Sequence, residues 1–333
     1  MKFGIQIGPI FPSGLSAAEI LDFARQQAVT AKQSGFDGIM HGQHFLTGPD
    51  TQYLQAIPAL AHLVGICPGM HVHPILLLPL LNPIEVAEQT ATLDVASGGR
   101  LGITAAQGYR PVEFESFGIE MKTRGERMRE SIEAIRTLWS GESVSFAGKY
   151  YRFSNVTLCI RPLQPLPPIG VAADLVKTVV LAAESGNAWD ASPRHSKAFL
   201  RQAVPAFREA AARKGLPVKK INIIRELCVG KTTQEAEATF KDSFEATYRT
   251  MHAWAQPGER YDVSYEELLR ERAVVGDPKR VIEEIAAYQD EFSFEPFYWF
   301  RHYHPGMDFQ RALDTLRLFG SDVIPALRAR FPD

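Results

Sequence analysis

The stretch of residues 74–118 constrains the fold most, because it reads in order as a strand, a helix, a second strand and a loop. Its uninterrupted apolar run, 75–78, is typical of a strand covered on both faces, as in parallel sheets. Pro83 fits the first turn of the following helix, and Ser97-Gly98-Gly99 predicts where that helix ends. A second strand at 101–105 then completes one βαβ unit, which needs about 30 residues or more.

The rest of the chain continues this alternation. Strands are expected at 2–8, 38–41, 70–78, 101–105, 169–172, 188–191, 221–229 and 295–301. Helices are expected at 16–34, 52–64, 83–97, 123–139, 176–184, 195–214, 232–249, from 277 onward, and at 308–330. No strand opens into a G-x-G-x-x-G turn, so we predict a closed (β/α)8 TIM barrel of the α/β class rather than an open doubly wound sheet.

Two segments depart from the alternation. The period-two pattern of residues 143–158 predicts a hairpin excursion outside the barrel. Residues 256–275 are polar and contain Pro257 and Gly258, which indicates a lid-like insertion at the barrel opening. We predict one domain over residues 1–333.

Composition narrows the classes of function. Hydrophobic residues make up 45% and charged residues 22% of the chain, and the net charge of −2 gives no indication of nucleic acid or another polyanion as partner. The 3 cysteines are far apart, which favours reduced thiols over a disulfide framework. The N-terminal apolar stretch is broken by Gly8, Pro9 and Pro12, which argues against a signal peptide or a membrane span. We expect a cytoplasmic protein.

In a TIM barrel the C-terminal ends of the strands carry the chemistry, so the polar residues expected there are the candidates for a site. They are Gln6, His41, Gln43, His44, His71, His73, Gln107, Tyr109, Arg110, Asp174, Arg301, His302 and His304. Histidine can act as acid, base or hydrogen-bond donor near neutral pH. For each single histidine, ordinary packing is the alternative interpretation.

Several short stretches, in this order and spacing, resemble the luciferase-like flavin-dependent oxidoreductases. They are Leu78-Pro79-Leu80-Leu81-Asn82-Pro83, Ala87-Glu88, Leu93-Asp94, Ser97-Gly98-Gly99-Arg100-Leu101, Gly108-Tyr109, Glu113-Phe114 and Phe117-Gly118. The resemblance extends over nearly the whole chain.

The resemblance implies a two-component monooxygenase, which uses reduced FMN from a flavin reductase and O2 to oxidise a small, partly hydrophobic organic substrate. The alternatives are a hydride-transferring oxidoreductase dependent on coenzyme F420 and a non-catalytic flavin-binding protein of the same fold. Relatives often form homodimers through the helices flanking the second and third strands, so a homodimer is expected by analogy.

The same resemblance implies roles for individual residues. His44 would lie at the reactive face of the flavin, with Gln43 in place of a charged neighbour. A non-prolyl cis peptide before Ile75, with His73 and Pro74, would support the flavin ring from behind. Independently of the resemblance, Arg301 at the end of the last strand is a candidate catalytic residue that would bind an anionic substrate or the flavin carbonyls, with a salt bridge to a carboxylate at the barrel opening as the alternative. Gln43, Arg110 and His302 are the candidates for substrate contacts.

The residues at the positions that bind the cofactor phosphate match the family less well. Relatives often hold it with an arginine and a serine, where this chain has Gln107 and Leu175. Other candidates for cofactor binding are Gly108, Tyr109, Asp174 and Thr178. An apolar wall would come from Phe11, Phe45, Tyr109 and Trp299.

A metal-dependent hydrolase is a rival interpretation. His71-x-His73 and His302-x-His304 each place two imidazoles on one face of a strand, as barrel hydrolases do. Such a site also needs a ligating carboxylate and further histidines between the two pairs. Asp174 and Asp190 are the nearest carboxylates in the sequence, so we expect no metal site.

Overall fold

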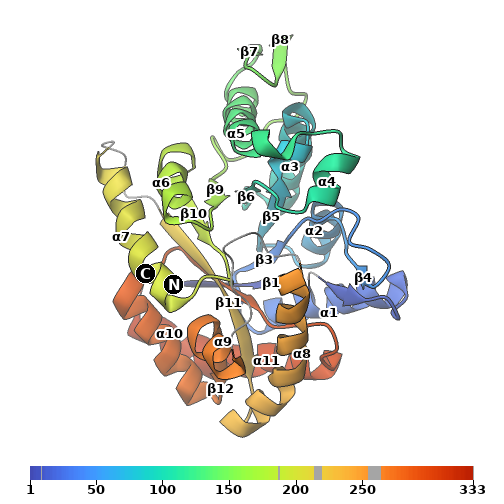
Figure 1. The fold of residues 1–333 in the computed structure, drawn as a ribbon. Coiled ribbons are helices and arrows are strands. Elements are labelled where there is room, and N and C mark those ends of the chain that lie inside the picture. The colour runs from blue at the N-terminus through green and yellow to red at the C-terminus, as the bar shows by residue number, and fades with distance from the viewer. Residues whose placement is uncertain (9, 187, 214–219, 254–263, 333) are drawn as a thin grey trace.

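The computed structural model describes residues 1–8, 10–186, 188–213, 220–253 and 264–332. Its centre is a closed ring of parallel strands in the order β1, β3, β5, β6, β9, β10, β11, β13 and back to β1 (Figure 1). Their bounds are Lys2–Gln6, Gly38–His41, His71–Leu77, Ile103–Ala106, Ile169–Ala172, Ala188–Ala191, Lys220–Val229 and Phe297–Arg301. The prediction of a closed (β/α)8 TIM barrel is confirmed.

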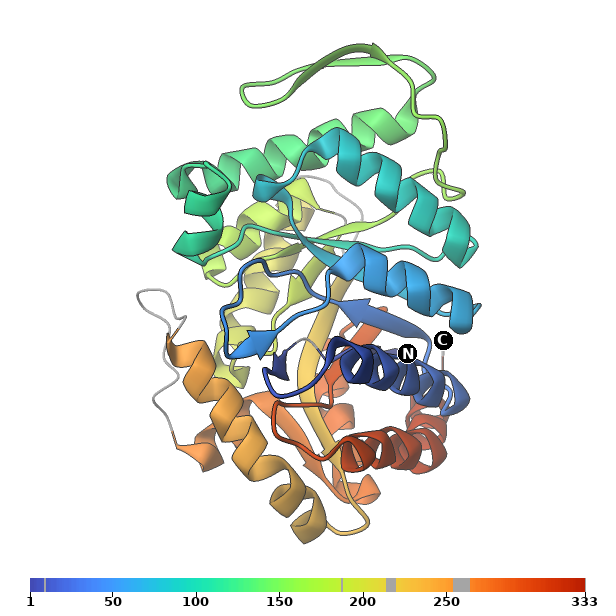
Figure 2. The same ribbon diagram turned by 90° about the vertical axis from the view of Figure 1, so that its right-hand side faces the viewer.

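Helices surround this ring. They are α1 (Ala17–Gln33), α2 (Ala56–Ile66), α3 (Pro83–Ser97), α4 (Pro111–Ser116), α5 (Arg124–Ser140), α6 (Val176–Ser185), α7 (Lys197–Arg213), α8 (Thr233–Ala253), α9 (Tyr265–Arg272), α10 (Pro278–Phe292), α11 (Phe309–Leu318) and α12 (Ile324–Arg330). Figure 2 shows the blue α1 beside the red α11, two helices that are in contact, so the first and last parts of the chain meet in the helical layer.

Local sequence signals explain where these helices begin and end. Ser16 caps α1, and Glu19 completes the capping box as the S-x-x-E spacing predicts. Asn82 caps α3, Pro83 occupies its first turn, and Gly98 ends it in the left-handed conformation with φ of 69°. Asp277 caps α10 in the same way, with Pro278 at its first turn.

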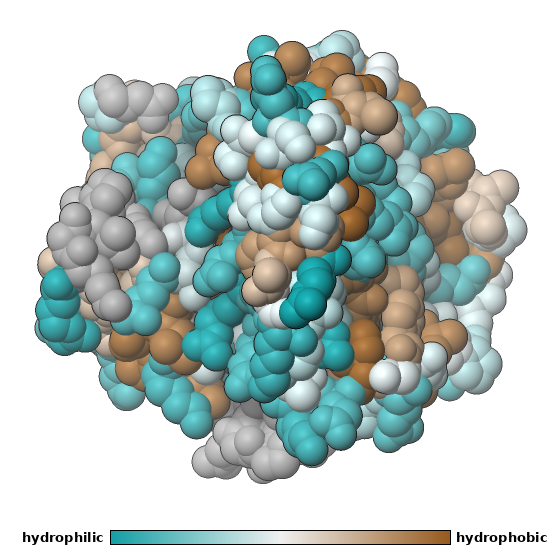
Figure 3. Space-filling view, turned by 90° about the horizontal axis from the view of Figure 1, so that it is seen from above, coloured by the Kyte–Doolittle hydropathy of each residue, from teal (hydrophilic) through white to brown (hydrophobic). Residues whose placement is uncertain are grey.

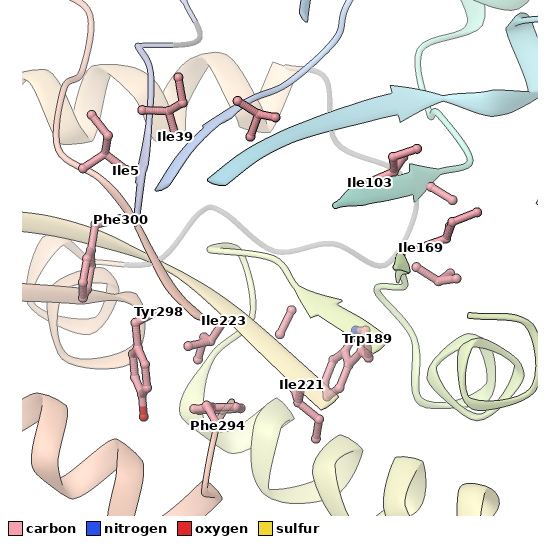
Figure 4. Packing of buried hydrophobic residues seen from close by; sticks show 14 of the residues in the cluster. Ile5, Ile39, Ile103, Ile169, Trp189, Ile221, Ile223, Phe294, Tyr298 and Phe300 are labelled. Atoms are coloured by element: carbon pink, nitrogen blue, oxygen red, sulfur yellow. The ribbon is translucent and has the colours of Figure 1, made fainter. Parts of the chain in front are cut away.

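Strand residues alternate between the helical layer and the barrel interior. On β13, Tyr298 and Phe300 belong to the core between strands and helices, together with Ile5 and Ile39 of the neighbouring strands (Figure 4). Phe297 and Trp299 face the interior instead. Trp299 fills the space left by Gly4 and Gly38, where a Cβ atom would overlap its ring. The prediction that Trp299 lines the substrate wall is therefore wrong.

The segment expected to form a lid divides into three parts. Residues 256–263 lie outside the described residues, whereas 265–272 form α9 and Ala273–Gly276 form strand β12, which pairs with the second half of β11. The end of this segment thus belongs to the main sheet, because β11 is long enough to pair with β13 first and β12 beyond it.

The hairpin of β7 (Val144–Ala147) and β8 (Arg152–Val156) stands away from the barrel beside α5. Its turn is attached to α5 by Glu130, whose carboxylate accepts hydrogen bonds from the backbone N–H groups of Lys149, Tyr150 and Tyr151 at 2.7–3.0 Å.

The expected cis peptide before Ile75 is not present. In the described part of the chain the cis bond is Glu295–Pro296, an X-Pro bond. Strand β5 pairs in regular register with β3 as far as Pro74 and with β6 from Ile75 onward, so the strand continues without a bulge at this place. None of the helices in the described residues is long and apolar enough to cross a membrane.

Candidate active site

His44 lies just beyond the end of β3, at the barrel mouth, which we define as the C-terminal ends of the ring strands. Its Nδ1 is 3.0 Å from Oε1 of Glu113, and its Nε2 is 3.4 Å from the hydroxyl of Tyr109. The rings of Tyr53 and Tyr109 each contact the imidazole edge to face, with centroids 5.6 and 5.5 Å away. The imidazole is therefore fixed in position while 15% of the side chain stays exposed.

Glu113 is fully buried and orients His44. Burial raises the pKa of Glu113, but hydrogen bonds from His44 and the Phe45 N–H, together with the charge of Arg110, outweigh burial and hold the pKa below its ordinary value. An ionised carboxylate only accepts hydrogen bonds, so a neutral His44 carries its proton on Nδ1 and presents Nε2 as an acceptor. The second carboxylate oxygen, Oε2, has no hydrogen-bond partner among the described residues.

Arg110 holds the loop that follows His44. Its Nη1 donates to the Phe45 carbonyl at 2.6 Å and lies 3.3 Å from Glu113, and its Nη2 donates to the Leu46 carbonyl at 3.0 Å. Leu46 has a φ of 51°, which is uncommon for a residue with a side chain, and its side chain is exposed. Arg110 thus stabilises an unfavourable backbone conformation two residues from His44.

A second chain of contacts runs from Tyr109 along the mouth. The guanidinium of Arg194 lies 5.1 Å from the centre of the Tyr109 ring, and its Nη2 donates to Oδ2 of Asp174 at 2.8 Å. The other Asp174 oxygen is 3.0 Å from Nε2 of His195. Burial raises the pKa of Asp174, but Arg194 and His195 lower it well below its usual range. The loops after β6, β9 and β10 are joined by these contacts.

The opposite side of the mouth contains an ion pair. Arg301 and Glu226 are neighbours in the register of β13 and β11, and the Arg301 Nε donates to Glu226 at 2.8 Å. Glu226 is also 3.3 Å from Nε2 of His304 and from the hydroxyl of Tyr248 on α8. Burial raises the pKa of Glu226, and the charge of Arg301 lowers it more, to about 2. Arg301 is thus engaged in a salt bridge with a buried carboxylate.

The structure separates other candidates from this mouth. His73 lies within the barrel, where its Nε2 is 2.8 Å from the Thr104 hydroxyl, which in turn donates to Asp190. His41 contacts the carbonyls of Ile7 and Leu54. Phe11 packs against Phe23 and Tyr303 in a separate core cluster. These three have structural partners away from His44.

The remaining candidates lie on or near the mouth. The Gln43 side chain accepts from the Leu77 N–H at 3.1 Å, and the Thr178 hydroxyl contacts both backbone groups of the exposed Leu175. Gly108 has a φ of 76°, which lets the loop turn tightly above Phe114. Gln107 faces Gly125 at the start of α5. His302 is fully buried, with both ring nitrogens unpartnered among the described residues, and burial lowers its pKa to about 3.

Sequence reasoning missed three residues of the site. Glu113 belongs to the Glu113-Phe114 motif, but the sequence analysis assigned it no function. Glu226 and Arg194 lie in no recognisable motif. Only Asp174 and Tyr109, which Arg194 contacts, were candidates.

The metal interpretation gains no support from the geometry. His71 is near the Lys2 ammonium, at 3.3 Å, whereas His73 contacts Thr104. In the described ranges, His, Cys, Asp and Glu side chains do not form a group of three or more able to hold a metal.

Comparison with known proteins identifies the family. The family model described as luciferase-like monooxygenase matches residues 1–292. The chain belongs to the luciferase-like monooxygenase family. The predicted family is confirmed, and with it the assignment of the protein as an oxidoreductase.

Relatives of this family member use either of two cofactors. The oxygenase component of flavin-dependent trigonelline monooxygenase from Acinetobacter baylyi is 28% identical over 273 residues, which covers 74% of this chain and 73% of the relative. The F420-dependent glucose-6-phosphate dehydrogenase of Intrasporangium calvum is 30% identical over 264 residues, covering 74% and 76%. The crystal structure of monooxygenase RslO1 from Streptomyces bottropensis superposes with a TM-score of 0.84 at 25% identity, over 98% of this chain and 99% of that one. The FMNH2-dependent dimethylsulfone monooxygenase of Pseudomonas putida is also similar, so both predicted cofactors, FMN and F420, are found among relatives.

Proposed function

We propose that this protein is the oxygenase component of a two-component monooxygenase, which takes reduced FMN from a separate reductase and uses O2 to oxidise a small organic molecule. The observation that carries the proposal is the position of His44 at the mouth of a luciferase-like barrel. Its Nδ1 lies 3.0 Å from the buried Glu113 carboxylate, and its Nε2 lies 3.4 Å from the Tyr109 hydroxyl. The flavin supplies the redox chemistry when bound.

The residues at the mouth fit a flavin nucleotide. Oε2 of Glu113 is a buried acceptor without a hydrogen-bond partner in the part of the chain that the structure describes, and His44, Gln107 and Tyr109 provide polar groups on nearby loops. Asp174, Leu175 and Thr178 lie at the start of α6, which follows β9, and Gly108 lies on the loop after β6. We assign cofactor binding to this side of the mouth.

His44 is the proposed catalytic residue. Glu113 keeps the Nδ1 proton in place, so that Nε2 can accept a proton from the substrate or, when protonated, donate a hydrogen bond. Tyr109 restricts the ring from the other side. Arg301, locked to Glu226, contributes charge at the opposite wall rather than moving a proton, because an arginine stays protonated.

An apolar edge next to His44 favours a partly hydrophobic substrate. Phe45 packs on Phe117 with ring centroids 4.8 Å apart, and Leu46, Val112 and Phe117 are exposed. Arg110 would fix this edge through the Phe45 and Leu46 carbonyls.

Exposed apolar residues also support the expected homodimer. Ile66 at the end of α2 and Val95 on α3 are 39% and 42% exposed, on the helices next to β3 and β5. Viewed onto the hairpin side, Figure 3 shows hydrophobic residues in several separate patches among hydrophilic ones. We assign the dimer contact to α2 and α3, and sedimentation at increasing concentration tests it.

The activity is tested by combining the protein with a flavin reductase, NADH, FMN and isotopically labelled O2, together with a panel of small aromatic and aliphatic compounds. A product that contains labelled oxygen, formed only when the protein is present, supports the proposal. Absence of such a product with every compound, together with no binding of FMN, would contradict it.

The second candidate is an F420-dependent dehydrogenase, favoured by the 30% identical relative. Titration with F420 followed by a panel of alcohols and sugars distinguishes the two functions. Loss of the oxidised F420 absorbance, without any need for O2, would assign the second function.

A further inference from the structure

The buried arginines of the described residues differ in how their charge is balanced. They are Arg110, Arg225 and Arg301. Arg301 donates to the buried carboxylate of Glu226, and Arg110 lies 3.3 Å from the buried carboxylate of Glu113. Arg225 is 1% exposed and forms no ion pair with any of the described residues. A buried charge without a counter-charge is costly, so Arg225 is the arginine that needs an explanation.

Arg225 lies between β11 and the helical layer. It is two residues beyond Ile223 on β11, and so on the same face, and Figure 4 shows Ile223 in the core between strands and helices. Its Nη1 donates to the carbonyl oxygens of Ser192 and Ile224 at 3.4 and 3.3 Å, which are long contacts. Its Nε and Nη2 are buried and have no hydrogen-bond partner among the described residues. These two atoms form the edge of the guanidinium whose parallel N–H groups bind an anion as a fork.

Tyr288 on α10 supplies a second unused donor beside this guanidinium. The centre of its ring is 5.1 Å from Cζ of Arg225 and 4.8 Å from Nζ of Lys197. The Tyr288 hydroxyl is buried and has no hydrogen-bond partner in the described ranges. Glu284 pairs with Lys197 at 3.0 Å and so offsets the charge of the lysine. The charge of Arg225 stays unbalanced by the described residues.

We propose that a small monovalent anion, of about the size of chloride, binds between Nε and Nη2 of Arg225 and the hydroxyl of Tyr288. All three groups can donate a hydrogen bond, and a water molecule in this place would satisfy the hydrogen bonds without balancing the charge. Arg225 and Tyr288 are only 1% and 3% exposed, which favours a small ion over a larger one.

The anion site is separate from the barrel mouth. Glu226, the next residue on β11, pairs with Arg301 at the mouth, so Arg225 lies on the opposite face of the same strand. An ion can approach from solvent near Lys197, which is partly exposed and lines a pocket between α8, α9 and α10. The inference therefore does not depend on which cofactor the protein uses.

Thermal unfolding of the full chain in sodium chloride and in sodium gluconate, at equal ionic strength, tests the site. Chloride that binds the folded protein alone should raise the melting temperature progressively with its concentration, whereas gluconate is too large to enter. Arg225→Met should lose this chloride-dependent rise. Tyr288→Phe should weaken the apparent chloride affinity about tenfold, because one hydrogen bond to a charged group is removed.

Arg208→Met is the matched control. Arg208 lies on α7 and donates to the carbonyl oxygens of Phe292 and Ser293 at the end of α10, so it belongs to the same helical layer without facing the proposed site. This variant should keep the full chloride-dependent rise. An equal rise in wild type and Arg225→Met would overturn the inference.

Crystals soaked in sodium bromide give a second measurement, which does not require any variant to fold. Bromide replaces chloride and is located by its anomalous scattering. A peak within hydrogen-bonding distance of Nε and Nη2 of Arg225 supports the site. A chloride-dependent rise without such a peak would place the ion elsewhere, and a water molecule at the Arg225 fork in bromide-soaked crystals would equally overturn the inference.

Discussion

Two histidine–carboxylate arrangements in this barrel look alike in composition and differ in surroundings. Inside the ring, His73, Thr104, Asp190 and Asn222 form a closed polar layer, in which Asp190 accepts from Thr104 and Asn222 at 2.6 Å each. At the mouth, His44 pairs with Glu113, and one Glu113 oxygen has no partner in the described residues. In the first arrangement both carboxylate oxygens accept hydrogen bonds, whereas in the second only one does among the described residues.

The difference shows how to tell a structural polar cluster from a candidate site. A buried carboxylate whose oxygens are both bonded stabilises the fold, because any loss leaves its partners unsatisfied. A buried carboxylate with a spare oxygen, beside a histidine that is partly exposed, can serve a ligand.

The largest expected effect is on turnover in His44→Ala. Loss of the proposed proton-transfer group should reduce turnover about 100-fold, with little change in the melting temperature. The measurement is the rate of oxygenated product formation, in parallel with thermal unfolding. His62→Ala on α2 is the control, and equal turnover in the two variants would remove the proposed role of His44.

Asp190→Asn should act in the opposite way. The asparagine amide has only one acceptor oxygen, so it cannot accept hydrogen bonds from both Thr104 and Asn222 as the carboxylate does. We therefore expect the free energy of unfolding to fall by about 2 kcal/mol. Turnover per folded molecule should be unchanged, since the layer lies inside the barrel. Urea unfolding measures the first quantity and product formation the second. A large loss of turnover with unchanged stability would reverse the comparison.

Glu113→Gln should affect both quantities. We expect about a tenfold loss of turnover, because His44 loses a charged acceptor. Because the folded pKa of Glu113 is depressed, its contribution to stability is present above the ordinary glutamate pKa of about 4.3 and is lost as the pH falls through the folded value.

Melting temperatures of wild type and Glu113→Gln should therefore differ most near pH 7 and converge as the solution becomes more acidic than about pH 4.3. A difference that grows on acidification would show that Glu113 does not have the depressed pKa.

The smallest expected effect is in Glu130→Gln. The carboxylate that holds the hairpin turn lies away from both clusters, so its replacement should lower stability by less than about 1 kcal/mol and leave turnover unchanged. The matched control is Glu133→Gln, an exposed residue of the same helix. Limited proteolysis should then cleave the hairpin faster in Glu130→Gln alone, and equal cleavage of the two variants would argue against the role of Glu130.

The sequence by itself determined the order of the elements and most of the barrel. Strands such as 38–41, 169–172 and 188–191 could be placed because short buried apolar runs between turn residues depend on local composition. Capping signals at Ser16, Asn82 and Asp277 act within a few residues, so they too can be recognised without a structure.

Only the tertiary structure decided which polar residues meet. His44 and Glu113 are 69 residues apart, and Arg301 and Glu226 are 75 apart, so no local pattern links them. Strand β12 was missed for the same reason, since it exists through its pairing with β11. Local signals set each segment, whereas side-chain partners depend on the closure of the ring, which brings distant strand ends to one mouth.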